Sequence, residues 1–146
     1  MAIDTARPIR LLVLALTAFG LLAVSTELTL LEHYEEPTML IPLGTNALAL
    51  VAVVAHAFAD SSTTVRALRG AMLVLVVTGV LGVALHYRGS LEFQIDMDPT
   101  LSAWELFWKV LHMKAPPTLA PGAIAQLGLL GLIATYRHPA LERGSR

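Results

Sequence analysis

The chain has 146 residues, of which 55% are hydrophobic and 14% are charged, and its mean hydropathy is +0.67. This composition excludes an ordinary soluble domain of the same length and favours an integral membrane protein. The formal net charge is −1 and no cysteine is present. The sequence therefore offers neither a basic surface for nucleic acid nor a thiolate for disulfides, metal binding or catalysis.

Four apolar segments have about the length that a helix needs to cross a bilayer, which is roughly 20 residues. They cover residues 11–31, 39–59, 71–87 and 119–136. Apolar residues occupy every face of these segments, which favours membrane helices over the striped helices of a soluble bundle. We predict an all-α integral membrane protein, a four-transmembrane-helix bundle in a single domain over residues 1–146.

The first segment could also be a secretory signal peptide. Arg7 and Arg10 precede its apolar run, and Ala23-Val24-Ser25 resembles a cleavage site with small residues. The apolar run is longer than the 7–15 residues usual for a signal peptide, so we favour an uncleaved first helix.

Basic and acidic residues lie mostly on opposite sides of the predicted bundle. Seven of the ten basic residues lie at the two termini and between the second and third segments: Arg7, Arg10, Arg66, Arg69, Arg137, Arg143 and Arg146. Eight of the eleven acidic residues lie on or near the other side: Glu27, Glu32, Glu35, Glu36, Glu92, Asp96, Asp98 and Glu105. The positive-inside rule then places both termini in the cytoplasm, and we expect the inner (plasma) membrane of a prokaryote.

The two outer connections, residues 32–38 and 88–118, are predicted to form an acidic cap. In the second connection, LEFQIDMD at residues 91–98 alternates apolar and polar residues, which predicts an extended segment with one apolar face. Either Asp98-Pro99 or the capping box Ser102-x-x-Glu105 can then begin a short amphipathic helix. We expect this helix to lie in the membrane interface, with docking on a partner as the alternative. Its aromatic anchors would be Trp104, Phe107 and Trp108.

Each predicted span contains one polar residue at a comparable depth. These residues are Glu27, Asn46, Thr78 and Gln126. They could form hydrogen bonds between helices, or they could line a site for a ligand, an ion or a proton. Because a carboxylate in hydrocarbon is costly, Glu27 is expected to face the bundle interior.

Two pairs of glycines, Gly79-x-x-Gly82 and Gly128-x-x-Gly131, lie in the third and fourth spans. Small residues let helix backbones approach closely, so these pairs predict tight packing between helices.

Histidines on the outer side suggest a metal site. Imidazole and carboxylate ligands suit zinc, copper(II), iron or manganese, and the candidates are His33, Glu36, His86 and His112. Haem ligated by two histidines is less favoured, since only His33 and His86 lie at similar depth and both lie beyond the hydrocarbon. A chlorophyll-type pigment needs only one histidine, but nothing in the sequence selects it. On the inner side His56 lies four residues before Asp60, and His138 follows the last span.

Three functions follow from these features. We favour a non-catalytic accessory or scaffolding subunit in a larger membrane complex, in contact with lipid and with other membrane subunits or further copies of itself. The alternative is a binding or transport module for a cation, a metal or a small ligand, with an acidic outer cap and a polar layer within the membrane. A metal-dependent membrane enzyme that uses the outer His and Glu residues is the third.

Overall fold

The computed structural model describes residues 6–113 and 119–143, and within them the only regular structure is helical. In chain order the elements are α1 (Ala6–Leu30), the 3-10 helix η1 (Pro37–Met39), α2 (Leu40–Phe58), α3 (Ser62–Met97), α4 (Ala103–Leu111), α5 (Leu119–Ala134) and α6 (Pro139–Arg143). Three helical segments are long and apolar enough to cross a membrane: α1, η1 with α2, and α3. Helix α5 is as apolar but has only 16 residues.

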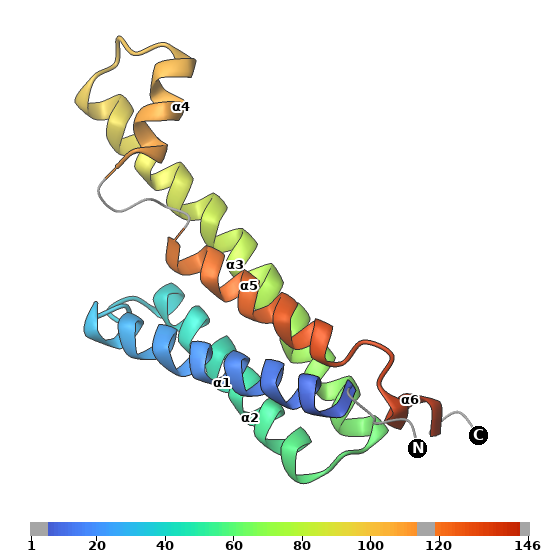
Figure 1. Ribbon diagram of the computed structural model, residues 1–146. Helices are drawn as coiled ribbons and strands as arrows, with labels where there is room; N and C mark the ends of the chain where they lie inside the picture. The colour runs from blue at the N-terminus through green and yellow to red at the C-terminus, as the bar shows by residue number, and fades with distance from the viewer. Residues whose placement is uncertain (1–5, 114–118, 144–146) are drawn as a thin grey trace.

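Helices α1, α2, α3 and α5 lie side by side and alternate in direction (Figure 1). Helix α3 packs against α2 and α5, and α1 packs against the same two helices from the other side. We call the end of this bundle that holds the start of α1 and helix α6 the terminal end, and the opposite end the distal end.

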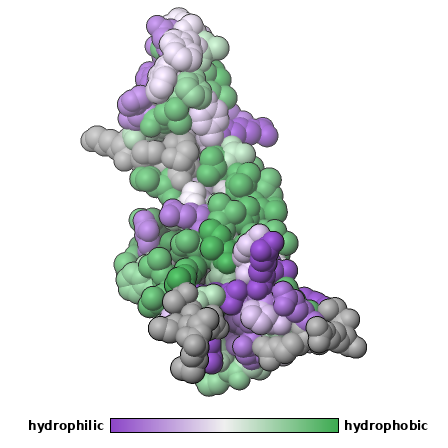
Figure 2. All heavy atoms as spheres, turned by 45° about the vertical axis from the view of Figure 1, so that its right-hand side comes forward, coloured by the Kyte–Doolittle hydropathy of each residue, from purple (hydrophilic) through white to green (hydrophobic). Residues whose placement is uncertain are grey.

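The outward surface of the bundle is apolar, as a lipid bilayer requires. Large hydrophobic side chains such as Leu12 and Phe19 are each 70% exposed. On the face shown in Figure 2, hydrophobic residues form the middle of the molecule and hydrophilic residues gather toward its two ends. An exposed apolar surface of this extent is typical of contact with lipid.

Helices α3 and α5 approach each other at glycines, as the sequence predicts. A Cβ atom placed on Gly79 would lie 2.5 Å from the backbone nitrogen of Ala125 and 2.5 Å from the carbonyl oxygen of Pro121. A Cβ atom on Gly128 would lie 2.7 Å from the carbonyl oxygen of Met72. The two backbones are therefore in direct contact, which only glycine permits.

Helix α3 is much longer than the predicted span at residues 71–87. It begins at Ser62 because Ser61 forms a capping box with Thr64, in which the backbone N–H of each residue donates to the other's hydroxyl at 3.2 Å. Arg66 and Arg69 consequently lie within the helix rather than in a loop. An apolar run gives the length of the membrane-crossing part of a helix, whereas the helix itself can continue into the polar residues on either side.

The prediction of an extended segment at residues 91–98 is wrong, because helix α3 continues to Met97. An eight-residue alternation also places apolar residues four apart, as at Leu91 and Ile95, and this spacing suits a helix equally well. An ion pair four residues apart, from Arg88 Nε to Glu92 Oε1 at 2.8 Å, accompanies the continuing helix. The helix stops before Asp98-Pro99, where proline disfavours helical backbone in the residue ahead of it.

Helix α4 folds back along the end of α3, and together α3 residues 88–97 and α4 form a distal hairpin that extends beyond the other helices (Figure 1). The predicted capping box starts α4, since the Ser102 hydroxyl donates to Glu105 Oε2 at 2.6 Å and the Ser102 N–H donates to the same oxygen at 2.9 Å. These hydrogen bonds hold the pKa of the Glu105 carboxyl below its usual value.

Replacing Gly79 by Ala should destabilise the fold, whereas the same change at Gly70 should not. At Gly79 the added methyl group meets the backbone of α5, and over-packing of this kind costs about 1–3 kcal/mol. At Gly70, in the same helix, nothing lies within 4 Å of the added atom, and alanine stabilises a helix interior by about 0.5–1 kcal/mol. Thermal unfolding of the two variants in detergent would measure both effects, and equal midpoints would refute the close contact.

Candidate functional site

A groove opens at the distal end between the α1–α2 connection and the middle of α3. Its volume is about 1010 Å³. Most of its lining is apolar, with polar groups at a few positions: His33, Glu36, Thr38, Met39, Ile41, Pro42, Thr78, Leu81, Gly82, Leu85, His86, Gly89, Ser90, Phe93 and Met113. A large apolar groove with a few polar groups is the usual form of a small-molecule site.

The end of α1 positions His33 at this groove. Glu32 adopts left-handed backbone with φ of 55°. The N–H of His33 then donates to Leu28 O at 2.9 Å, and the N–H of Glu32 donates to Thr29 O at 3.1 Å. This pair of bonds is a Schellman motif, which ends the helix and turns the chain toward α2.

Three of the four predicted outer metal ligands lie around the groove. The His33 and His86 rings are stacked with centroids 6.2 Å apart, and Glu36 lines the same groove. His112 is engaged elsewhere, with its Nδ1 2.8 Å from the Trp108 carbonyl oxygen. Among the described residues, no three of these four side chains bring ligand atoms within 4.8 Å of one another. Metal binding by this set stays a prediction.

The four polar residues predicted at similar depth do not meet in one layer. Asn46 is fully buried, and its Nδ2 donates to Ser25 Oγ at 3.2 Å, while its Oδ1 has no partner within the described part of the chain. Thr78 is half-buried and lines the groove. Glu27 and Gln126 are exposed on the outside of the bundle. Sequence position determines depth along a helix but not which way the side chain faces.

The predicted aromatic anchors lie together on α4. Trp104, Phe107 and Trp108 contact one another with ring centroids 5.3 to 6.0 Å apart. All three are exposed, while Leu106 and Val110 on the same helix are buried. The aromatic face of α4 is therefore directed away from the protein.

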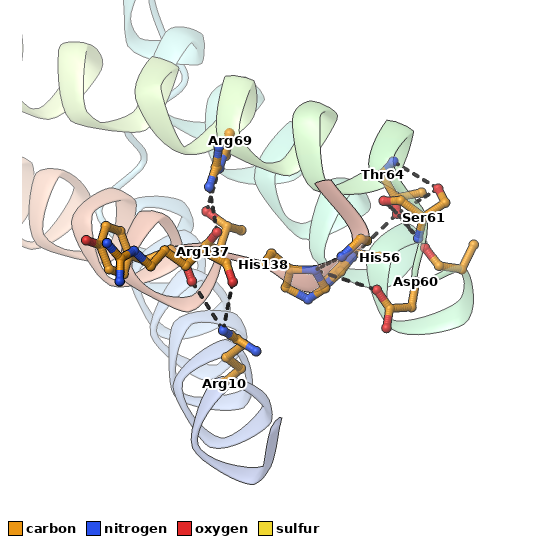
Figure 3. Close-up of polar contacts among 12 residues, drawn as sticks. Arg10, His56, Asp60, Ser61, Thr64, Arg69, Arg137 and His138 are labelled. Carbon is orange, nitrogen blue, oxygen red and sulfur yellow. Dashed lines mark hydrogen bonds and ion pairs between the residues drawn. The ribbon is translucent and has the colours of Figure 1, made fainter. Parts of the chain in front are cut away.

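A second cluster, which the sequence analysis did not assign to a site, lies at the terminal end. It consists of His56 in the last turn of α2, Asp60 between α2 and α3, and His138 between α5 and α6 (Figure 3). One ligand atom from each side chain lies within 4.8 Å of the other two. Both imidazoles are buried, whereas the Asp60 side chain is 56% exposed.

Local structure positions the cluster. His56 Nδ1 lies 3.4 Å from the hydroxyl oxygen of Thr64, and Thr64 is the residue that completes the capping box of α3. His138 Nδ1 lies 3.8 Å from Asp60 Oδ1 and accepts a hydrogen bond from the Ala140 N–H at 3.3 Å. The spacing of His56 and Asp60 was visible in the sequence, but nothing in the sequence brought His138 to them.

Two arginines from other helices cap the end of α5, next to this cluster (Figure 3). Arg69 Nη2 donates to Thr135 O at 2.6 Å and Arg69 Nε donates to Thr135 Oγ1 at 3.2 Å. Arg10 Nη2 donates to the carbonyl oxygens of Tyr136 at 3.3 Å and Arg137 at 3.2 Å. Cations at a helix C-terminus satisfy its last carbonyl groups and interact favourably with its dipole.

No protein-family model, curated protein or solved structure matches this chain. The function of the chain must therefore follow from the chemistry of its own residues, at the distal groove and at the cluster of His56, Asp60 and His138.

Removing the Arg69 guanidinium should loosen the connection from α5 to α6. An Arg69→Met variant loses both donors to Thr135, a fully buried residue, and hydrogen bonds from charged groups contribute about 1.5–3 kcal/mol. We expect faster hydrogen exchange of the amides of residues 135–141 and a lower unfolding midpoint. Arg66→Met, an exposed position on the same helix, is the matched control, and identical exchange in both variants would contradict the capping role.

Proposed function

We propose that this chain is a small membrane protein that binds an amphiphilic ligand in its distal groove. The observation that carries the proposal is the convergence of His33, Glu36 and His86 on one wide apolar groove. A polar headgroup would lie among these three side chains. An alkyl chain would lie along apolar residues such as Ile41 and Leu85.

The charges around the groove favour a cationic headgroup. Glu36 lines the groove, and Glu32 and Glu35 belong to the same short connection. The basic residue next along α3, Arg88, is already paired with Glu92 at 2.8 Å. Among the described residues at this mouth, the carboxylates therefore outnumber the unpaired arginine and lysine side chains. Opposite charges attract by about 1 kcal/mol at 4 Å even in water.

We further propose four membrane spans with both termini in the cytoplasm. Helix α5 supplies the fourth span, because it packs along α3 over the depth of the bundle (Figure 1). The excess of arginine at the terminal end supports this orientation by the positive-inside rule. The groove would then open toward the outer leaflet and the outer water layer.

A second candidate function, an accessory subunit of a larger membrane complex, is favoured by the aromatic face of α4. Trp104 is 67% exposed at the far end of the molecule, beside Phe107 and Trp108. Aromatic residues of this kind are enriched both at protein interfaces and at the membrane interface. Stoichiometric copurification of another membrane subunit that depends on these residues would favour this function over ligand binding.

Filling the groove should weaken ligand binding. Gly89 lines the groove and has nothing within 4 Å of an added Cβ atom, so Gly89→Phe can begin its side chain there without meeting the backbone and place a ring at the groove. We expect the chain in lipid nanodiscs to bind hexadecyltrimethylammonium more tightly than hexadecyl sulfate. Gly89→Phe should weaken the binding of hexadecyltrimethylammonium by about tenfold, the effect of 1.4 kcal/mol. Titration calorimetry would measure both ligands.

Gly70→Phe is the matched control for this experiment, since Gly70 lies in the same helix with open space around it but outside the groove. Glu36→Gln should reduce the preference for the cation without abolishing binding of the alkyl chain. Equal binding of the two detergents, or equal losses at Gly89 and Gly70, would contradict the proposed site.

The orientation can be tested with single cysteines, because the chain has none of its own. Glu35→Cys and Ala67→Cys place thiols at exposed positions on the distal and terminal ends. In intact cells a membrane-impermeant maleimide should label position 35 and should reach position 67 only after the membrane is permeabilised. Labelling of both positions from the same side would refute the topology.

A further inference from the structure

We propose that His56, Asp60 and His138 bind a divalent transition-metal ion at the terminal end of the bundle. This site is separate from the distal groove and does not depend on the ligand proposed for it. Its three side chains come from two parts of the chain that are distant in sequence, and their ligand atoms lie within 4.8 Å of one another.

The distances are close to those of a bound ion. Zinc bonds to nitrogen and oxygen of about 2.0–2.1 Å place tetrahedral ligand atoms roughly 3.3–3.4 Å apart. His138 Nδ1 and Asp60 Oδ1 are already 3.8 Å apart. An ion at Nδ1 would take the lone pair that now accepts the hydrogen bond from the Ala140 N–H at 3.3 Å. The Asp60 side chain is more than half exposed, so a change of rotamer can bring its carboxylate closer to the imidazoles without disturbing the core.

The donor set is suited to a transition metal rather than to calcium or magnesium. Two imidazoles and one carboxylate are typical of zinc sites that keep a position open for solvent, and of iron(II) sites with the same ligands. Hard cations such as magnesium prefer oxygen ligands throughout. The exposed side of Asp60 gives the ion access to water, which can complete its coordination.

Thr64 is placed to orient one of the ligands. Its hydroxyl lies 3.4 Å from His56 Nδ1, and it also contacts the carbonyl oxygen of Ala59 and the Ser61 hydroxyl. A hydrogen bond of this kind to one ring nitrogen selects the tautomer in which the other nitrogen can bind metal. Thr64 would therefore act as a positioning residue, without touching the ion.

The neighbouring arginines do not oppose a cation at this site as strongly as their charge suggests. In Figure 3 the guanidinium groups of Arg10 and Arg69 lie to one side of His138, and Asp60 lies to the other. Both guanidinium groups donate to carbonyl oxygens of the turn that directly follows α5, close to the negative end of the helix dipole. The carboxylate of Asp60 thus faces the two imidazoles from the side opposite these two guanidinium groups.

A bound ion would connect segments that are distant in sequence. His56 lies in the last turn of α2 and Asp60 in the connection from α2 to α3, whereas His138 lies between α5 and α6. Ligands that are held together only in the folded chain make metal affinity part of the folding free energy. The metal would therefore stabilise the terminal end against separation of these two parts of the chain.

The test is a zinc titration of the full chain, purified without a histidine tag and treated with a chelator. We expect one Zn²⁺ per chain by calorimetry. Asp60→Asn and His138→Ala should each weaken binding by more than about tenfold, since even a lost outer partner costs 10–100-fold. Cobalt(II) substitution should give absorption bands of a nitrogen- and oxygen-ligated site that both variants lose.

His112→Ala is the matched control, because it removes an imidazole on α4 that lies outside both proposed sites, with its Nδ1 2.8 Å from the Trp108 carbonyl oxygen. It should leave the zinc affinity unchanged. The proposal is overturned if the chain binds no zinc, if the Asp60 and His138 variants bind it normally, or if the His112 variant loses it. Asp60→Asn alters an exposed side chain of the same shape, and circular dichroism of this variant before zinc is added would verify that it is folded.

Discussion

The contact between the backbones of α3 and α5 is the constraint on which the rest of the structure depends. At Gly79 and Gly128 the two helices touch without intervening side chains. In lipid the hydrophobic effect does not drive helices together, so close van der Waals packing must do so. This contact joins the end of the chain to its middle, and α1 and α2 complete the bundle around it.

The terminal and distal ends of the bundle differ in structure, and each end holds a candidate site. At the terminal end, arginines from α1 and α3 hydrogen-bond the carbonyl groups of the turn that follows α5, and this turn brings His138 to His56 and Asp60. At the distal end, a Schellman motif ends α1 while α3 continues past it. The unequal helix lengths leave the groove beside α3 that holds His33 and His86.

Arg10 and Arg69 show that one residue can serve two purposes. On the proposed topology, the positive-inside rule alone accounts for their position. The structure adds hydrogen bonds to the carbonyl oxygens of Tyr136, Arg137 and Thr135. An arginine at one end of the bundle is thus also available to hydrogen-bond the turn that follows a neighbouring helix at the same end.

The sequence by itself determined the helical class, the apolar segments, the close approach at the glycines and the capping box of α4, because each follows from neighbours within one or two turns. It did not determine that residues 91–97 are helical, since eight alternating residues suit both a strand and a helix. Only the tertiary structure decided which polar residues meet. Depth along a helix follows from residue number, but direction around it depends on packing, so Glu27 faces outward while Asn46 is buried. For the same reason His138 joins His56 and Asp60 only through the packing of α5 on α3 and the turn that follows α5.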